Sequence, residues 1–499
     1  MTAIPGLRPA IPEKPINLGK PMKPLLPLLA AVVLAAGPAA PMSAADPPAK
    51  RPNILFIMTD QHTIGALGCA GNPHVSTPHL DRLAARGIRF TKSYVANPLC
   101  VPSRASIFSS RTPHALGVYG NTMDAELHKK SVPTMGELFQ AAGYETAYAG
   151  KWHVHAAFPA YMGRQIPGFT VLPLGGKDPR QGDKKTEQKS PQCDPHITAA
   201  AIQFLGQPHP QPFLLTVSLL NPHDICEFGR YEGFRPPRLP TDEVSLPPPP
   251  PNLRDPEPLP SALDEDRAKH GERTELQWRQ YRSVYYRLVE SSDENIGRIL
   301  DALDQNGLAA NTVVVFTSDH GEMMGAHGMV SKQKLYEESV AVPLIIAAPG
   351  TAPGVDRRHL VGGIDLMPTF LDYAGIAAPD SLEGRSLRPI VEGKPVAWRN
   401  FIAAETYGPE ARMIRTDRYK YIAFADGERR EQLFDEEQDP GETKNLVDDP
   451  LAAEEVARHR RLLEEWMLAT ADTVGKGTQE LEFVKRREQG RSRANVEAE

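Results

Sequence analysis

The chain has 499 residues, of which 24% are charged and 40% hydrophobic, a composition ordinary for a globular protein with room for two or three domains. Its formal net charge of −6 argues against a protein that binds nucleic acid, because such proteins usually carry a basic excess. The same charge does not exclude an anionic ligand, since one pocket can be positive on an acidic protein.

Residues 1–45 have the features of a signal peptide. Two lysines precede the apolar stretch 25–40, and Ser43 and Ala45 are the small residues of a cleavage site. A start at Met22 would give a tidier signal peptide. The apolar stretch is short and broken by prolines, and no other stretch is long enough to span a membrane. We therefore expect an exported protein, periplasmic or extracellular, with no membrane span.

Buried strands and capped helices alternate along residues 46–396. Apolar runs without polar alternation are typical of strands in a parallel sheet, and Thr or Ser before Pro or Glu is typical of helix starts. The predicted elements are, in chain order, a strand at 52–58, helices at 78–87 and 135–143, a strand at 213–220, a helix at 281–306 and a strand at 312–317. This order predicts an α/β doubly wound, mostly parallel sheet forming a catalytic domain over 46–396.

The remaining segments have a different texture. Residues 235–260 are dense in proline, so we expect an extended surface insertion that forms no strand ladder. Short antiparallel strands and a helix at 450–470 are predicted to form a smaller α+β subdomain over 397–472. Residues 473–499 are a charged tail, expected to be helical or disordered.

Three of the predicted strands lead into polar residues. The first leads into Asp60 and Gln61, the second into His223, and the third into Asp319 and His320. Ligands of open α/β sheets bind at the carboxyl ends of the strands, so we expect these residues to lie together. Carboxylate and amide oxygens suit calcium or magnesium, and the nitrogen of His320 makes manganese conceivable as well.

The segment Cys100-Val101-Pro102-Ser103-Arg104 resembles the signature of the type I, formylglycine-dependent sulfatases of the alkaline-phosphatase-like superfamily. Further motifs of that family follow in the same order along the chain. They are Gly150-Lys151-Trp152-His153, Asn221-Pro222-His223, Lys332, Tyr336-Glu337, 342–345, 365–369, 383–387 and 433–446. The resemblance therefore covers about residues 52–449, and it implies the fold of that superfamily.

The resemblance implies that Cys100 is oxidised to formylglycine by a formylglycine-generating enzyme. As a gem-diol, residue 100 would attack sulfur and also ligate the metal. Arg104, Lys151 and Lys332 would bind the sulfate oxygens, with Lys334 as an alternative to Lys332. A helix start at Pro102 would place residue 100 at a positive helix terminus, which favours an anionic intermediate.

Two histidines are implied to move protons. His153 would act on the formylglycine hydroxyl, and His223 would protonate the leaving alcohol. Asn121 and His327 would line the substrate side or merely satisfy a loop. The implied metal ligands are Asp60, Gln61, Cys100, Asp319 and His320, with Ca²⁺ preferred and Mg²⁺ or Mn²⁺ possible.

The metal motifs leave the reaction open. Many family members have Asp-Asp and Asp-Asn where this chain has Asp60-Gln61 and Asp319-His320, a pattern more like the choline-sulfatase and phosphonate-monoester-hydrolase branches. The segment with Lys151 and His153 is more like true sulfatases. We therefore expect a sulfatase acting on a sulfated carbohydrate or small molecule, with a phosphodiesterase or phosphonate monoester hydrolase as the alternative. An inactive relative that only binds glycans is disfavoured, because such a protein needs neither the nucleophile nor the acid that the motifs of this chain imply.

Two finer points stay open in the sequence. With Cys100 converted, Cys69, Cys193 and Cys226 remain, which allows at most one disulfide. The insertion after His223 carries Arg230, Arg235 and Arg238, which would meet carboxylate or sulfate groups on a neighbouring sugar or contact only water.

Overall fold

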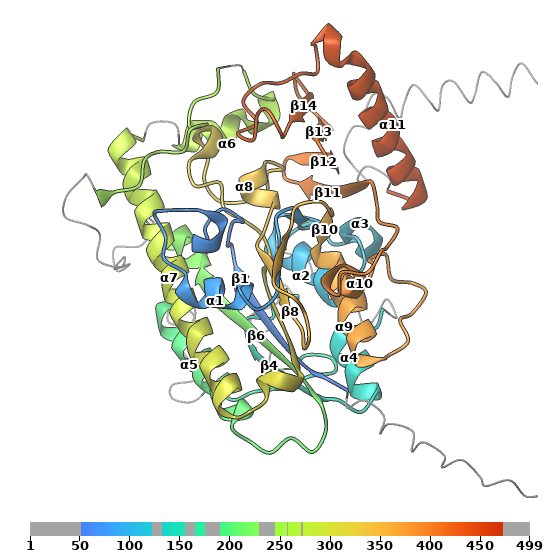
Figure 1. The fold of residues 1–499 in the computed structure, drawn as a ribbon. Helices are drawn as coiled ribbons and strands as arrows, with labels where there is room; N and C mark the ends of the chain where they lie inside the picture. Colours follow the sequence, from blue (N-terminus) through green and yellow to red (C-terminus); the bar gives the residue numbers. More distant parts are fainter. Residues whose placement is uncertain are drawn as a thin grey trace, which may run out of the picture. The chain divides into compact units, whose positions relative to one another are not determined.

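The core of the computed structural model is an eight-stranded sheet with the order β5-β4-β6-β1-β7-β8-β2-β9 (Figure 1). Its strands are β1 (Asn53–Asp60), β2 (Ile88–Phe90), β4 (Glu145–Gly150), β5 (Thr170–Val171), β6 (Phe213–Pro222), β7 (Thr312–Ser318), β8 (Leu344–Ala347) and β9 (Gly354–Asp356). Two short strands, β3 (Ser93–Tyr94) and β10 (Val361–Gly362), pair separately. Strand β8 runs antiparallel to its neighbours β7 and β2, and the other pairs are parallel. The predicted mostly parallel sheet is confirmed.

The structure describes residues 51–121, 132–154, 165–174, 190–228, 245–256, 258–270 and 273–472. The predicted signal peptide, the charged tail and the three arginines of the insertion lie outside these ranges. None of the helices within the described ranges is long and apolar enough to cross a membrane. The described parts of the proline-rich insertion form no strand, as expected. All four cysteines are free thiols.

Helices cover both faces of the sheet. Successive residues of β1 point to opposite faces, so alternate residues of the strand pack against different sets of helices. Ile54, Phe56 and Met58 pack with residues of α2 (Cys100–Ser109), α4 (Met135–Ala141) and α9 (Leu366–Ala374). Leu55 and Ile57 pack with residues of α1 (Pro78–Ala84), α5 (Ser190–Leu205) and α7 (Glu275–Gln305). Figure 1 shows the two sets of helices on either side of β1. Burial on both faces explains the uninterrupted apolar runs of the central strands.

Local capping sets where these helices begin. The predicted capping box of Thr134 and Glu137 is present at α4. Helix α7 begins at Glu275, earlier than the predicted Tyr281, because Thr274 and Gln277 form a second capping box. In that box Thr274 N donates to Gln277 Oε1 over 2.7 Å, so two backbone donors that a helix start leaves unpaired are satisfied.

A second, antiparallel sheet follows the central one, as predicted. It consists of β11 (Phe401–Tyr407), β12 (Glu410–Thr416), β13 (Tyr419–Phe424) and β14 (Glu431–Asp435). One face packs against α11 (Ala453–Ala469) through Leu463 and Met467. The other face packs against Tyr336 and Val340 near α8 (Glu337–Val340), in the segment that follows β7. The remaining short helices are α3 (Pro113–Leu116), α6 (Asp264–His270) and α10 (Arg388–Val391).

Candidate active site

The carboxyl ends of β1 and β7 bring the two predicted metal segments together. The strands pair in parallel with Thr59 opposite Ser318, so Asp60 and Asp319 leave the sheet side by side. Gln61 N donates to Asp319 Oδ1 over 3.1 Å, which ties the second residue of one segment to the first residue of the other. The expectation that the fold unites these segments is confirmed.

Helix α2 carries Cys100 to the same place. The helix begins at Cys100, so the thiol lies at a helix N-terminus, where an anion is stabilised. Ser103 Oγ donates to the Asp319 carbonyl oxygen over 2.5 Å, and this bond joins the helix to the end of β7. Asn121 Oδ1 accepts from Val101 N over 3.0 Å. The described contact of Asn121 therefore caps the cysteine's helix.

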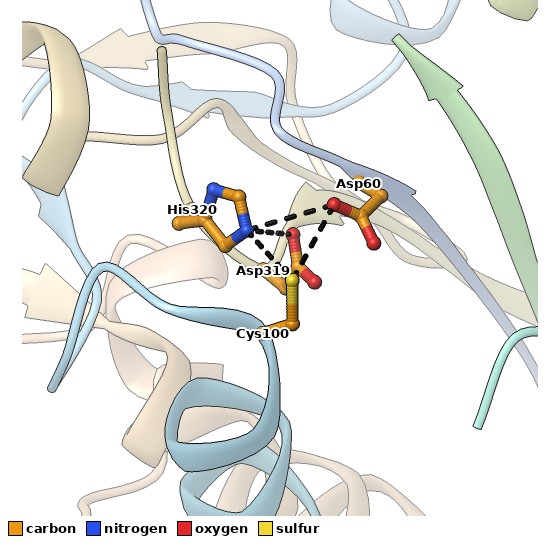
Figure 2. A group of neighbouring side chains, drawn as sticks. All are labelled: Asp60, Cys100, Asp319 and His320. Carbon is orange, nitrogen blue, oxygen red and sulfur yellow. Dashed lines mark hydrogen bonds and ion pairs between the residues drawn. The ribbon is translucent and has the colours of Figure 1, made fainter. Parts of the chain in front are cut away.

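Four buried side chains meet at this point, and Figure 2 shows how they face one another. Asp60, Cys100, Asp319 and His320 each offer one ligand atom, and these atoms lie within 4.8 Å of one another. His320 Nε2 lies 3.2 Å from Cys100 Sγ and 3.5 Å from Asp60 Oδ1. Its Nδ1 donates to the Gly321 carbonyl oxygen over 3.0 Å, so in the neutral ring the lone pair of Nε2 faces the group. Two carboxylates and an oriented imidazole fit a divalent cation.

Two lysines surround Cys100 with positive charge. Lys151 forms an ion pair with Asp60, and its Nζ lies 3.7 Å from Cys100 Sγ. Gly150 makes this approach possible, because its φ is +106° and a Cβ there would lie 2.0 Å from the Ser218 carbonyl oxygen. Lys332 Nζ lies 3.3 Å from Cys100 Sγ. Lys334 Nζ instead donates to carbonyl oxygens and pairs with Asp266, so Lys332 is the lysine that reaches residue 100.

The cations decide the charge state of their neighbours. Burial acts to raise the pKa of the Cys100 thiol, but Lys151, Lys332 and His320 together hold it well below its usual range. Burial and Cys100 also oppose ionisation of Asp60, yet Lys151, His223 and Lys332 keep the pKa of that carboxyl below its usual value. The position of residue 100 is therefore one where an anionic group is stabilised.

His153 and His223 are both partly exposed. The Cys100 side chain acts to raise the pKa of each ring. Burial, followed by the charge of Lys151, lowers the pKa of His153 to about 4. Burial, followed by the charge of Lys332, lowers the pKa of His223 to about 4. Both rings are therefore neutral at pH 7 in the absence of an anionic ligand.

Arg104 makes contacts other than those the motif implies. It is fully buried, and its Nε and Nη2 donate to Asp319 Oδ2 and Asp60 Oδ2 over 2.7 and 3.2 Å. Its Nη1 donates to the Lys151 carbonyl oxygen and Ser218 Oγ over 2.8 and 2.9 Å. These donors are directed at protein groups, so the guanidinium holds the two carboxylates in place.

The Gln61 amide lies between two charged residues. Its Nε2 donates to Glu322 Oε2 over 2.5 Å, and its Oε1 accepts from Lys332 Nζ over 2.8 Å. Its role as a metal ligand stays a prediction. Glu322, which the sequence analysis did not single out, is fully buried and also accepts from Tyr281 Oη and Ser331 N. A carboxylate directly after Asp319-His320-Gly321 was the available signal.

His327 lies in a different cluster. It is fully buried, its Nδ1 bonds to Asp255 Oδ1 over 2.5 Å, and its ring stacks on Tyr336 with centroids 4.0 Å apart. Its backbone N donates to the Asn252 carbonyl oxygen over 2.7 Å. Of the two alternatives for His327, these contacts favour the one in which the residue satisfies a loop.

Comparison with known proteins agrees with this geometry. Residues 52–376 match the family model for sulfatases, and residues 325–468 match the model described as N-sulphoglucosamine sulphohydrolase, C-terminal. A Δ4,5-hexuronate-2-O-sulfatase of Bacteroides thetaiotaomicron is 30% identical, over 85% of this chain and 90% of its own. An ulvan-active sulfatase of Formosa agariphila is 33% identical, over 81% of this chain and 78% of its own.

Solved structures show the same fold. A protein solved in complex with its substrate D-glucosamine-2-N,6-O-disulfate superposes with a TM-score of 0.70 at 27% identity, over 85% of this chain and 99% of its own. The phosphonate monoester hydrolase of Agrobacterium radiobacter shares the fold, with a TM-score of 0.69 at 23% identity over 84% of this chain and 96% of its own. With the family model covering most of the chain and the motifs placed around Cys100, the protein belongs to the sulfatase family and is a sulfuric ester hydrolase.

Proposed function

We propose that this sulfuric ester hydrolase uses formylglycine at residue 100 and a divalent metal to remove sulfate from a sulfated carbohydrate. The observation that carries the proposal is the approach of Lys151 and Lys332 to the Cys100 side chain, which also influences the pKa of His153 and of His223. The relatives support the carbohydrate substrate, because those named for their substrate include sulfatases of a hexuronate and of ulvan.

The ligands of the cation would be Asp60, Asp319, His320 and residue 100, with Gln61 as a further candidate. When bound, calcium or another divalent cation supplies charge that polarises a sulfuryl oxygen, and formylglycine supplies the hydroxyl that attacks sulfur. Arg104 acts indirectly, by fixing Asp60 and Asp319. This positioning role replaces the direct sulfate contact implied by the motif, since the donors with described contacts are already engaged with protein groups.

The chain's other residues bind the anion and move protons. Lys151 and Lys332 would bind the sulfate oxygens through Nζ. The negative charge of bound sulfate offsets the lysine charges, so it raises the pKa of His223 above about 4 and lets Nε2 or Nδ1 carry a proton to the leaving alcohol. His153 would take the hydroxyl proton of residue 100, for which the neutral ring is required.

One measurement tests the modified nucleophile. The protein is produced together with a formylglycine-generating enzyme, and the peptide from Ser93 to Arg104 is analysed by mass spectrometry. We expect the mass of the aldehyde or its hydrate at residue 100. A fully active preparation that contains only unmodified cysteine would overturn the mechanism.

The second candidate function is hydrolysis of a phosphate diester or phosphonate monoester. The shared fold of a phosphonate monoester hydrolase and the Asp60-Gln61 and Asp319-His320 pairs favour it, and sulfuryl and phosphoryl transfer make similar demands on a site. Comparing kcat/KM on an aryl sulfate and an aryl phosphate diester separates the two. A higher value on the diester would replace the sulfatase assignment.

The place of action is part of the same proposal. The predicted signal peptide over residues 1–45 would deliver the enzyme to the periplasm or the cell exterior, where sulfated polymers and their oligosaccharides are accessible. Expression of the full chain, followed by cell fractionation, tests this. We expect the exported fraction to contain a mature chain that begins near Asp46, whereas full-length protein confined to the cytoplasm would contradict export.

A further inference from the structure

Two tyrosines lie against each other at the surface where the C-terminal sheet meets α3. Tyr119 is 40% exposed, and its ring centroid lies 4.5 Å from that of Tyr407, with the ring planes tilted by 59°. Helix α3 and strand β11 lie side by side here (Figure 1), joined by a bond of 2.8 Å from His114 N to Glu405 Oε1. We call Tyr119 and Tyr407 the tyrosine pair.

The tyrosine pair is close in sequence or in space to residues that neighbour the site around Cys100. Tyr119 precedes by two residues Asn121, whose Oδ1 caps Val101 N beside Cys100, and two residues span at most about 7 Å. Tyr407 precedes the hairpin residue Gly408, at which a Cβ would lie 3.9 Å from Gln333 Nε2. Gln333 follows Lys332, which reaches Cys100. Both tyrosines are therefore linked to the site around Cys100, Tyr119 through Asn121 and Tyr407 through Gly408 and Gln333.

The pair is held from below. The Arg412 guanidinium lies 4.8 Å from the Tyr407 ring centroid, and its Nη2 donates to Tyr407 Oη over 3.3 Å. Arg412 is itself fixed by Asp472 through bonds of 2.6 and 3.0 Å. An aromatic surface that is already ordered loses little conformational entropy when a ligand binds.

The charges beneath the pair disfavour an anionic ligand. Glu405 and Glu410 lie within 3.8 Å of Arg412 nitrogens, so three carboxylates, including Asp472, share one guanidinium and the His114 ring. Arg412 is 1% exposed, so it offers no accessible cation to a second sulfate or a uronate. The exposed feature is an aromatic surface with hydroxyl groups, which suits the apolar C–H face of a pyranose.

We propose that the tyrosine pair is a subsite that stacks an uncharged sugar ring next to the sulfated sugar of the substrate. The inference rests on the proposed sulfatase function. It adds to that function the prediction that the sugar next to the sulfated one carries no charge. It also assigns this part of substrate recognition to the loop after α3 and to β11 of the C-terminal sheet, rather than to the arginines of the proline-rich insertion.

Three probes test the subsite in the full-length, formylglycine-containing enzyme. They are 4-nitrophenyl sulfate, a sulfated galactan oligosaccharide with an uncharged neighbouring ring, and a heparin-derived oligosaccharide with a uronate neighbour. We expect kcat/KM to be higher on the galactan than on the heparin oligosaccharide. Tyr119→Ala and Tyr407→Ala should each lower the ratio of kcat/KM on galactan to that on 4-nitrophenyl sulfate about fivefold, mainly through KM, as stacking of about 1 kcal/mol implies.

Matched variants control for the fold. Tyr119→Phe and Tyr407→Phe keep the rings and should keep the ratio. Tyr419→Ala, on the α11 side of the same sheet, should also keep it. Three outcomes would overturn the subsite. The wild-type enzyme could prefer the uronate oligosaccharide, or it could turn over neither oligosaccharide. The alanine variants could also lose the same factor of kcat/KM on all three probes. A wild-type enzyme that hydrolyses none of the three sulfate esters would instead overturn the proposed function.

Discussion

The site has a buried half and a partly exposed half, and they are built differently. Asp60, Arg104, Asp319 and His320 are fully buried and come from strand ends or α2, where the sheet's register fixes them. His153 and His223 are partly exposed and follow β4 and β6, beyond the ladder hydrogen bonds. The comparison indicates that the sheet fixes the proposed metal ligands and the position of residue 100, while loops carry the residues proposed to move protons.

The largest effect is expected in the buried half, at Cys100, the proposed nucleophile. Cys100→Ala should lower kcat on 4-nitrophenyl sulfate by about 10⁴-fold or more, as loss of a nucleophile does in other hydrolases. The melting temperature should change little, because the motif's ties to β7 run through Ser103 and Arg104 rather than through the thiol. Stopped assays measure kcat, and thermal unfolding measures the melting temperature. If Cys100→Ala keeps its turnover, residue 100 is not the nucleophile.

Removal of the proposed cation should have the next largest effect. Asp60 and Asp319 lie side by side, held by Arg104, and the proposed cation would add positive charge between them. We expect chelation to lower kcat about 10³-fold and added calcium to restore it. Asp319→Asn should lower the metal content measured by mass spectrometry, whereas Asp255→Asn, beside His327 and away from the group, should leave it unchanged. Full activity of metal-free enzyme would refute the ligand assignment.

His223→Ala sharpens the comparison, because it concerns the partly exposed half. A histidine that donates a proton is active below its pKa, and the pKa of His223 without ligand is about 4. For an alkyl sulfate, kcat/KM should therefore fall as pH rises above about 4, while the limb for kcat lies at higher pH because bound sulfate raises that pKa. His223→Ala should remove this limb and cost about 10²-fold.

The leaving group supplies the control. 4-Nitrophenol is acidic enough to leave without a proton, so His223→Ala should affect 4-nitrophenyl sulfate much less than an alkyl sulfate. Equal losses on both substrates would show that His223 positions the anion instead of protonating the alcohol.

The sequence predicted the buried half better than its surroundings, for physical reasons. Asp60 and Asp319 follow uninterrupted apolar runs, and the pairing of such strands leaves few alternatives for where their ends lie. The contacts of Arg104 could not be predicted, because a motif shows a guanidinium but not which acceptors its donors meet. His327 depended on a loop: its φ of 55° and its bond to Asp255 arise from tertiary contacts with residues far along the chain.

The smallest effect is expected at Glu322, which would contact neither the proposed cation nor the sulfate. In Glu322→Gln, Oε1 can still accept from Tyr281 and Ser331, but an amide group replaces the oxygen that faces Gln61. The Gln61 amide would turn its oxygen toward residue 322 and its NH₂ toward Lys332, so Lys332 loses an acceptor. We expect kcat/KM on 4-nitrophenyl sulfate to fall about tenfold, the cost of one misplaced charged hydrogen bond of about 1.5 kcal/mol. The loss should lie mainly in KM, because Lys332 would hold the sulfate.

Lys334→Met is the matched control, since Lys334 bonds to carbonyl oxygens and Asp266, and it should change kcat/KM far less. Rates are normalised to the formylglycine content of each variant. If Glu322→Gln folds and leaves kcat/KM unchanged, Lys332 is held by residue 100 and the anion alone, and the buried half needs no support beyond its own ligands.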